Sequence, residues 1–293
     1  MTAPTLSIVA PVYNEARILP ELVARCTQAA QQRSLPFEIV IVDDASTDDT
    51  PALLANLVRD ERVRQRRLPS NAGQFRATQA GLREARGLWI VVLDGDLQDP
   101  PEYIPRLVDA LAAAAPSVVA VLAVKSRRDD PAAFMIGQSV FHRLQHVLSR
   151  VPLPRGAGSY CVMRRAVAQR VAMAELTQAN LAAVVAVAAR ALGGELATLP
   201  YEKGRRYDDS GRVGWRGLVA EAIGSLAVTG ALSRLLGLTA IALGAGGLAA
   251  RGYSVGRCVL LGAGALAAGS SLWVGRRIRH SLAGMRTAGG IES

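Results

Sequence analysis

The chain has 293 residues, half of them apolar, which is enough for one large domain with an appendage or for two modest domains. Its formal charge of +10 comes almost wholly from arginine, since Lys125 and Lys203 are its only lysines. Such an arginine bias is explained either by a GC-rich genome or by a binding partner that carries phosphates. Basic side chains are not interleaved with aromatic ones, as they are in single-strand binders, so the pattern favours an anionic membrane surface over nucleic acid.

Short apolar runs alternate with helical patterns along the first two thirds of the chain. Strands are predicted at residues 6–10, 37–42, 88–93, 117–124 and 156–163. Helices are predicted at residues 16–32, 50–58, 74–85, 101–114, 134–148, 165–174 and 180–191, and a charged, glycine-containing segment follows at 201–216. Strands that are apolar throughout and alternate with helices indicate an α/β fold with a mostly parallel sheet covered on both faces.

Acidic or polar clusters follow three of these strands, at residues 14–15, 43–44 and 94–96. In parallel sheets the ligand lies beyond the carboxyl ends of the strands. Because all three clusters fall at such ends, we expect them to converge in one cleft. This convergence is the first indication of a functional site.

The triplet Asp94-Gly95-Asp96 is the sharpest local signal. Two carboxylates one residue apart, at the end of a buried strand, suit a hard divalent cation that also takes oxygens from a diphosphate. Such a cation would neutralise charge on a departing nucleoside diphosphate. Most isolated triplets of this kind are solvated turns, but the apolar strand before it and Gln98-Asp-Pro-Pro-Glu102 after it favour a site.

Two further segments carry polar groups that suit a nucleotide. Tyr13 has a ring that can pack on a base, and Asp43 or Asp44 can accept a hydrogen bond from a base or a ribose hydroxyl. The alternative for the two aspartates is a turn and helix cap ahead of Thr50. The turn that ends at Gly73 leads into a helix whose N-terminus can face phosphates.

The last part of the chain is apolar and basic. Residues 235–250 and 258–275 carry no charge, and the short connection between them contains Arg251 and Arg257. Their lengths and their glycine and alanine content predict two membrane-spanning helices, with a soluble helical hairpin buried on a partner as the alternative. Arg276-Arg277-Ile-Arg279 then predicts a cytoplasmic end.

Four motifs in this order resemble the glycosyltransferase family 2 enzymes, and more closely the dolichyl- or polyprenyl-phosphate sugar transferases. The motifs are Pro11-Val-Tyr-Asn-Glu15, Val42-Asp-Asp-Ala-Ser46-Thr-Asp48, Asn71-x-Gly73-Gln74 and Asp94-Gly-Asp96-Leu-Gln98-Asp-Pro-Pro-Glu102. The resemblance implies a GT-A type, Rossmann-like fold and a hexosyl- or pentosyltransferase. It also implies a GDP- or UDP-linked sugar donor and inverting transfer to a polyprenyl phosphate such as undecaprenyl or dolichyl phosphate.

The resemblance also implies roles for individual residues. The nucleoside and donor would be held by Pro11, Tyr13, Glu15, Asp43, Asp44, Gly73, Asp94 and Gly95, with Arg205 or Arg206 closing over the donor. Mg²⁺ or Mn²⁺ would be held by Asp94, Asp96 and Gln98. Arg127 and Arg143 would grip the acceptor phosphate and act in catalysis with Asp94 and Asp96.

The chain departs from the family pattern in three places. No carboxylate stands in the segment from Gly158 to Arg164, which is closer to the aminoarabinose-type bacterial transferases than to the dolichyl-mannose type. The lysine usual after the Asn-x-Gly turn is absent, and Arg76 is the nearest base. The late arginine-glycine-serine pattern has altered spacing, at Arg206 and Ser210-Gly211.

The acceptor distinguishes the alternatives. A sugar hydroxyl needs a general base, which Asp129, Asp130 or Glu175 would have to supply. A lipid phosphate is already anionic, so arginines that bind it by bidentate contacts are sufficient. The third alternative is a non-catalytic nucleotide-sugar-binding protein, against which the intact Asp94 and Asp96 argue.

The predicted organisation follows from these segments. Residues 1–218 form the catalytic domain, 219–234 an amphipathic juxtamembrane helix, 235–275 two transmembrane helices and 276–293 a basic cytoplasmic tail. The chain is expected to be a multi-pass inner-membrane protein with a cytoplasmic catalytic domain and no signal peptide, and a homo-oligomer is left open. Three scattered cysteines predict no disulfide framework.

Overall fold

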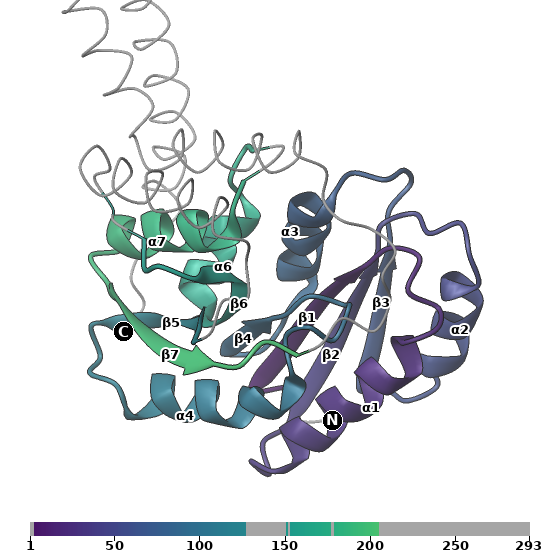
Figure 1. Ribbon diagram of the computed structural model, residues 1–293, viewed down its shortest axis with the longest axis horizontal. Helices are drawn as coiled ribbons and strands as arrows, with labels where there is room; N and C mark the ends of the chain where they lie inside the picture. Colours follow the sequence, from purple (N-terminus) through teal and green to yellow (C-terminus); the bar gives the residue numbers. More distant parts are fainter. Residues whose placement is uncertain (1–2, 127–150, 152, 177–178, 205–293) are drawn as a thin grey trace, which may run out of the picture.

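The computed structural model describes residues 3–126, 151, 153–176 and 179–204. In this part of the chain a seven-stranded sheet lies between two helical layers (Figure 1). The strands are β1 (Leu6–Val12), β2 (Phe37–Asp43), β3 (Val63–Arg67), β4 (Trp89–Val92), β5 (Val118–Lys125), β6 (Ala157–Arg164) and β7 (Glu195–Tyr201). The helices are α1 (Leu19–Gln31), α2 (Thr50–Leu57), α3 (Gln74–Glu84), α4 (Ile104–Ala113), α6 (Arg165–Ala172) and α7 (Leu181–Ala191), with a 3-10 turn η1 (Pro101–Tyr103) before α4.

The strands lie in the order β3-β2-β1-β4-β6-β5-β7. All neighbouring pairs are parallel except those of β6, which runs antiparallel to both β4 and β5. The prediction of an α/β fold with a mostly parallel sheet is therefore confirmed. Because β1, β2 and β4 point the same way, their carboxyl ends lie at one edge of the sheet.

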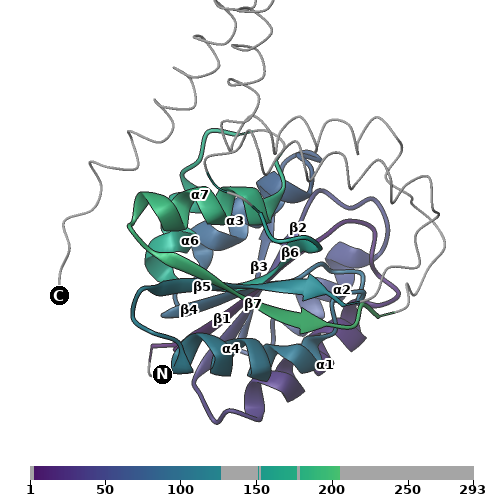
Figure 2. The same ribbon diagram turned by 60° about the vertical axis from the view of Figure 1, so that its left-hand side comes forward.

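Helices cover both faces of the sheet (Figure 2). Each face carries its own apolar core. Helices α1, α2 and α4 pack on one face through side chains such as Leu22, Leu54 and Leu107. Helices α3, α6 and α7 pack on the other through Leu82, Val167 and similar residues. Strands buried on both faces carry apolar side chains at most positions, which explains why the sequences of β1 and β2 are almost continuously apolar.

The two edge strands, β3 and β7, were not predicted from the sequence. Strand β3 reads Val-Arg-Gln-Arg-Arg and exposes most of its side chains, as edge strands that must not pair with other chains often do. Strand β7 contains Pro200, which an edge strand tolerates because one side of its backbone needs no partner. Because side chains at the edges of the sheet are partly exposed to solvent, these strands lack the continuous apolar sequence on which strand prediction relies.

The helix predicted at 134–148 and the membrane hairpin predicted at 235–275 lie outside the described residues, as do the segments 219–234 and 276–293. In the part of the chain that the structure covers, none of the helices has the length and apolar content that a bilayer span requires. The domain boundary predicted at residue 218 also falls outside the described residues.

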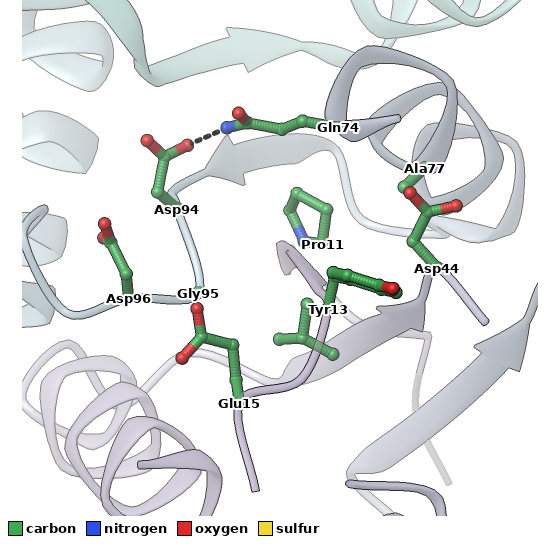
Figure 3. A pocket seen from close by; sticks show the side chains of 10 residues that line it. Pro11, Tyr13, Glu15, Asp44, Gln74, Ala77, Asp94, Gly95 and Asp96 are labelled. Atoms are coloured by element: carbon green, nitrogen blue, oxygen red, sulfur yellow. Dashed lines mark hydrogen bonds between the residues drawn. The ribbon is translucent and has the colours of Figure 1, made fainter. Parts of the chain in front are cut away.

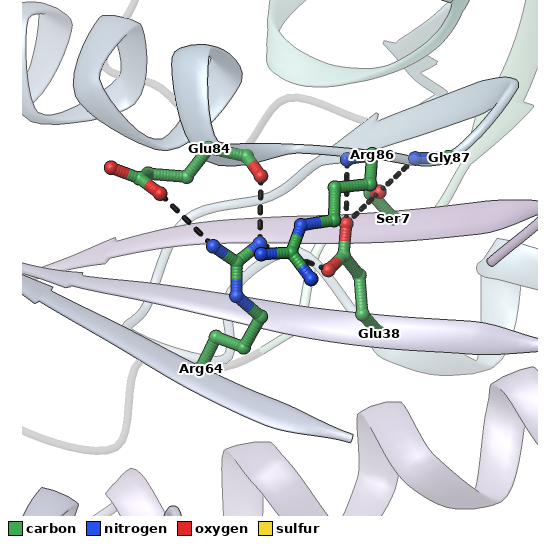
Figure 4. A network of polar contacts seen from close by, with 6 residues as sticks. All are labelled: Ser7, Glu38, Arg64, Glu84, Arg86 and Gly87. Carbon is green, nitrogen blue, oxygen red and sulfur yellow. Dashed lines mark hydrogen bonds and ion pairs between the residues drawn. The ribbon is translucent and has the colours of Figure 1, made fainter. Parts of the chain in front are cut away.

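A buried carboxylate joins the amino ends of three strands (Figure 4). Glu38 of β2 is 5% exposed and accepts hydrogen bonds from the Ser7 hydroxyl at 2.7 Å and from the Arg86 backbone N–H at 2.6 Å. Arg64 of β3 forms an ion pair with the same carboxylate at 3.1 Å. The Ser7 hydroxyl in turn accepts from the N–H of Gly87 at 2.7 Å, so the network ties the approach to β4 to β1 and β2.

We expect Glu38→Ala to lower the free energy of unfolding by about 2–4 kcal/mol, because it strands the buried donors and the Arg64 charge. Glu84→Ala is the matched control. Glu84 shares Arg64, but its side chain is 36% exposed, so its loss should cost less than about 1 kcal/mol. Urea unfolding of both variants measures the difference, and equal losses would contradict the role given to Glu38.

Candidate active site

A pocket opens at the carboxyl ends of β1, β2 and β4 (Figure 3). It is lined by Pro11, Val12, Tyr13, Glu15, Asp44, Gln74, Ala77, Asp94, Gly95 and Asp96. All three sequence clusters thus contribute to one site. Its volume of about 170 Å³ is below the roughly 300–1,000 Å³ typical of small-molecule pockets, so the described walls enclose only part of a ligand as large as a nucleotide sugar.

The loop after β1 is held by side chains of the loop after β2. The backbone N–H of Asn14 donates to Ser46 Oγ at 2.9 Å, and that of Glu15 donates to Thr50 Oγ1 at 3.0 Å. Asn14 has a φ of +56°, which asparagine tolerates better than most residues, and its side chain accepts from the N–H of Thr47 at 2.8 Å. The first loop is therefore shaped by the second.

This loop explains two features of the first motif. The helix predicted from residue 16 begins only at Leu19, and the N–H groups of residues 14–16 bond instead to side chains of residues 46–50. Tyr13, in turn, stands on the rim of the pocket with 44% of its surface exposed. An aromatic ring held in this way can stack on a base.

The neighbouring aspartates Asp43 and Asp44 have different environments. Asp44 lines the pocket, and its carboxylate accepts from the backbone N–H groups of Ala72 and Gly73 at 2.7 and 2.8 Å. Asp43 is 1% exposed, accepts from the N–H of Ser46 at 2.8 Å and pairs with Arg67. Asp43 therefore stabilises a turn, in line with the structural alternative considered for the two aspartates in the sequence analysis. Asp44, by contrast, can also contact a ligand in the pocket.

Gly73 and Gln98 lie beside the pocket without lining it. Gly73 is the N-cap of α3 and has a φ of +87°, which glycine adopts without strain. The backbone of Gln98 donates its N–H to Asp96 Oδ1 at 3.1 Å and accepts from the N–H of Gly204 at 2.8 Å. The backbones of both residues therefore shape the loops around the site, and the donor role predicted for Gly73 and the metal role predicted for Gln98 stay predictions.

The loop after β4 presents Asp94 and Asp96 on the same side of the pocket (Figure 3). Asp94 Oδ1 accepts from Gln74 Nε2 and from Ser159 Oγ. Between the two aspartates, a Cβ on Gly95 would lie 2.7 Å from the carbonyl oxygen of Pro11. Only glycine therefore lets this loop pack against the end of β1 and bring the carboxylates to the pocket.

Three carboxylates are close together in this loop. Burial, Asp99 and Asp96 raise the pKa of Asp94 to about 7, and the Ser159 hydroxyl and Lys203 only partly offset this. Burial also raises the pKa of Asp99. A divalent cation would relieve this repulsion, and carboxylate oxygens are its preferred ligands. Among the described residues, no group of three or more His, Cys, Asp or Glu side chains is arranged to hold a metal ion by itself.

The only two lysines of the chain meet beside these carboxylates. Lys125 ends β5 and Lys203 follows β7, and each acts electrostatically on Asp94 and Asp99. Burial, and then the neighbouring Lys203, lower the pKa of Lys125. Neither residue was among the site residues predicted from the sequence, although the scarcity of lysine in an arginine-rich chain was a usable signal.

Four of the predicted site residues, Arg127, Arg143, Arg205 and Arg206, lie outside the described residues, as do Asp129 and Asp130. Glu175 lies away from the pocket, in a separate hollow with Arg76, Arg83 and Met173. Gln74 and Ser159, which hold Asp94, were also missed as site residues, because their role depends on packing between distant segments.

The raised pKa of Asp94 predicts how the free energy of unfolding of the metal-free protein depends on pH. The folded protein keeps a proton on Asp94 up to about pH 7, whereas the unfolded chain releases it near its ordinary pKa of 3.8. The free energy of unfolding should therefore fall as the pH rises through this window. Asp94→Asn removes the penalty, so at pH 8 it should be more stable than the wild type, by at most about 4 kcal/mol.

Thermal unfolding in excess chelator at pH 8 and at pH 4 measures this effect. The two proteins should differ at pH 8 and nearly converge at pH 4, where the wild-type carboxyl is protonated in the folded protein and close to half protonated in the unfolded chain. The same difference at both pH values would show that the substitution acts through packing instead of charge.

Comparison with known proteins supports a common ancestry. Residues 7–172 match a family model described as glycosyl transferase family 2. An undecaprenyl-phosphate 4-deoxy-4-formamido-L-arabinose transferase of Pseudomonas fluorescens is 44% identical over 129 residues, 43% of this chain and 37% of that protein. One of the same description from Pectobacterium carotovorum is 36% identical over 177 residues, 58% of this chain and 51% of that protein. The chain thus spans only about a third to a half of the length of these relatives.

Solved structures share the fold. A mannosyltransferase from Pyrobaculum calidifontis, in complex with GDP-mannose and Mn²⁺, aligns with a TM-score of 0.53 and 21% identity over 99% of this chain and 77% of that one. A glucosyl-3-phosphoglycerate synthase from Mycobacterium tuberculosis, in complex with Mn²⁺, UDP-glucose and phosphoglyceric acid, aligns with a TM-score of 0.55 and 20% identity over 79% of each chain. At these identities the likeness concerns the fold alone.

Proposed function

The chain belongs to glycosyl transferase family 2, because residues 7–172 match the model of that family, and we propose a function on this basis. The protein transfers a sugar from a nucleotide-sugar donor to a polyprenyl phosphate. The observation that carries the proposal is the pocket in which Tyr13 and Asp44 stand across from Asp94 and Asp96 (Figure 3). A ring and a carboxylate on one side suit a nucleoside. Two carboxylates on the other suit a metal-bound diphosphate.

The donor side follows from the described residues. Tyr13 packs on the base, and Asp44 accepts from the ribose or base while its bonds to Ala72 and Gly73 hold it still. Asp94 and Asp96 hold Mg²⁺ or Mn²⁺, which when bound neutralises charge on the leaving nucleoside diphosphate. The Mn²⁺ and nucleotide-sugar complexes of proteins with the same fold agree with this assignment.

The acceptor side needs positive charge and no base. An acceptor phosphate is already ionised, so its oxygen can attack the anomeric carbon directly while the bond to the diphosphate breaks, which inverts the configuration. Lys125 and Lys203 place two cations beside the acidic loop, and we assign Arg127 and Arg143 to the phosphate itself. The undecaprenyl-phosphate transferases among the relatives support this acceptor class.

The rival is a family 2 transferase that acts on a carbohydrate hydroxyl. It requires a carboxylate base near the anomeric carbon. Of its three candidates, Glu175 lies in a separate hollow and the other two lie outside the described residues. Among the described residues, the structure therefore argues only against Glu175 as this base.

The purified 293-residue chain in detergent tests the proposal. It is incubated with Mn²⁺, a panel of UDP- and GDP-linked sugars, and undecaprenyl or dolichyl phosphate. Each lipid phosphate is paired with its uncharged alcohol. Transfer should occur with at least one donor and only to the phosphates. Equal transfer to the alcohols would contradict the phosphate mechanism, and transfer to neither lipid with any donor would reject the acceptor class.

The membrane assignment is a separate proposal, based on the uncharged segments of residues 235–275. A chain truncated after Gly230 should lose most of its partitioning into the membrane fraction, because the two predicted spans are gone. Some attachment through basic and amphipathic segments is expected to remain. A truncated chain that sediments with membranes as completely as the full chain would refute the hairpin anchor.

A further inference from the structure

The end of β7 is joined to the acidic loop by a buried hydrogen bond. The Tyr201 hydroxyl donates to Asp99 Oδ1 at 2.7 Å, and the two residues are 2% and 3% exposed. The other oxygen of Asp99 accepts from the backbone N–H of Asp94 at 3.3 Å. One carboxylate therefore connects a strand at the sheet edge, about a hundred residues further along the chain, to the first aspartate of the Asp94-Gly95-Asp96 triplet.

Further contacts hold the same junction. The N–H of Gly204 donates to the carbonyl of Gln98 at 2.8 Å, and a Cβ on Gly204 would lie 2.9 Å from the carbonyl oxygen of Leu97. The Tyr201 ring meets the ring edges of Tyr103 and Tyr160 at centroid distances of 5.9 and 5.4 Å. Two ring contacts and the hydrogen bond to Asp99 therefore hold Tyr201 and set the direction in which its hydroxyl points.

The loop needs such support for two reasons. Leu97 adopts a φ of +59°, a conformation that costs energy in a residue other than glycine and persists only where surroundings impose it. Asp99 is buried beside Asp94 and Asp96, where a third carboxylate is unfavourable. A phenylalanine at position 201 would fill the same space without a hydroxyl, so apolar packing alone does not explain a tyrosine there.

We propose that Tyr201, acting through Asp99, is a positioning residue that holds the Asp94 and Asp96 carboxylates in the arrangement that binds the divalent cation and the diphosphate. The metal part of this inference rests on the proposed function, whereas the positioning of the loop does not. Because Lys203 and Gly204 come only two and three residues after Tyr201, the same junction also sets where these residues lie against the loop.

Tyr201→Phe tests the inference, with Tyr103→Phe as a matched control. Tyr103 belongs to the same aromatic group, but its hydroxyl accepts from the N–H of Glu202 at 3.3 Å and does not contact Asp99. The first readout is amide hydrogen exchange, by mass spectrometry, of peptides that cover residues 93–100. The second is the affinity for Mn²⁺ in the presence of UDP, and separately of GDP, by calorimetry.

Loss of a hydrogen bond to a buried carboxylate should speed exchange in the loop about tenfold or more, and should weaken Mn²⁺ binding by a similar factor. Peptides from β1 and β2 should exchange as in the wild type. At saturating Mn²⁺ the kcat should stay within a few-fold of the wild-type value, because the reacting groups are unchanged. Tyr103→Phe should leave all these quantities near those of the wild type.

A double-mutant cycle with Asp99→Asn completes the test. If Tyr201 acts through Asp99, the double variant should be no worse than the more affected single variant, whereas additive effects would overturn the inference. Unchanged loop exchange in Tyr201→Phe would overturn it as well. Faster loop exchange in a protein whose wild type binds no Mn²⁺ would uphold the positioning role and would refute the metal site of the proposed function.

Discussion

Replacing Asp96 with asparagine is expected to lower kcat/KM for sugar transfer by at least about 100-fold, or ~2.7 kcal/mol of transition-state stabilisation. Asp96 lines the pocket on the same side as Asp94, and the substitution removes one of the two charges that would hold the cation. Its side chain also accepts from the N–H of Gln98, a bond that the amide oxygen can keep. The loss should therefore reflect charge more than loop structure.

Steady-state rates with the donor found active, at several Mn²⁺ concentrations, measure the effect. Asp109→Asn is a suitable control, because Asp109 lies on α4 in an exposed ion pair with Arg33 and away from the pocket. It should transfer sugar at the wild-type rate. Excess chelator should abolish activity of the wild type, and full turnover in chelator would reject the metal assignment.

The fold was largely predictable because the burial of strands and helices determines the pattern of apolar residues in the sequence. Strands covered on both faces, such as β1 and β2, are apolar at almost every position, and helices with one buried face show the 3.6-residue repeat. The charged edge strand β3 has no such apolar pattern. Adjacent residues in an extended chain point to opposite sides, so the sequence could not tell which of Asp43 and Asp44 faces the pocket.

The supports of Asp94 depend on strand register, which no local pattern contains. Strand β6 inserts antiparallel between β4 and β5, with Val92 opposite Cys161. Continuing that register past the end of β4 sets Ser159 beside Asp94, to which its hydroxyl donates. Tyr201 reaches Asp99 in a similar way, because β7 pairs with β5 and ends next to the acidic loop. Motifs locate the chemistry of this site, and the topology of the sheet determines what holds it.

The second large effect is expected on the acceptor side, at Arg127 and Arg143. If the acceptor is a lipid phosphate, these residues act on its binding and orientation, and alanine at either position should cost about 2–5 kcal/mol where the contact is desolvated. Lysine keeps the charge but loses the planar fork that binds a phosphate by two parallel hydrogen bonds, so it should already impair transfer. Calorimetry without acceptor should show a nucleotide-sugar affinity within a few-fold of the wild type.

The same measurements separate the phosphate acceptor from its rival. With a hydroxyl acceptor a carboxylate must remove a proton, so replacement of Asp129, Asp130 or Glu175 would abolish turnover while the two arginines would matter little. Glu175 already serves as an internal control, because it lies with Met173 in a hollow separate from the pocket and its replacement by glutamine should leave transfer unchanged. A carboxylate variant that loses activity while both arginine variants transfer sugar normally would end the lipid-phosphate mechanism, since an ionised phosphate needs no base.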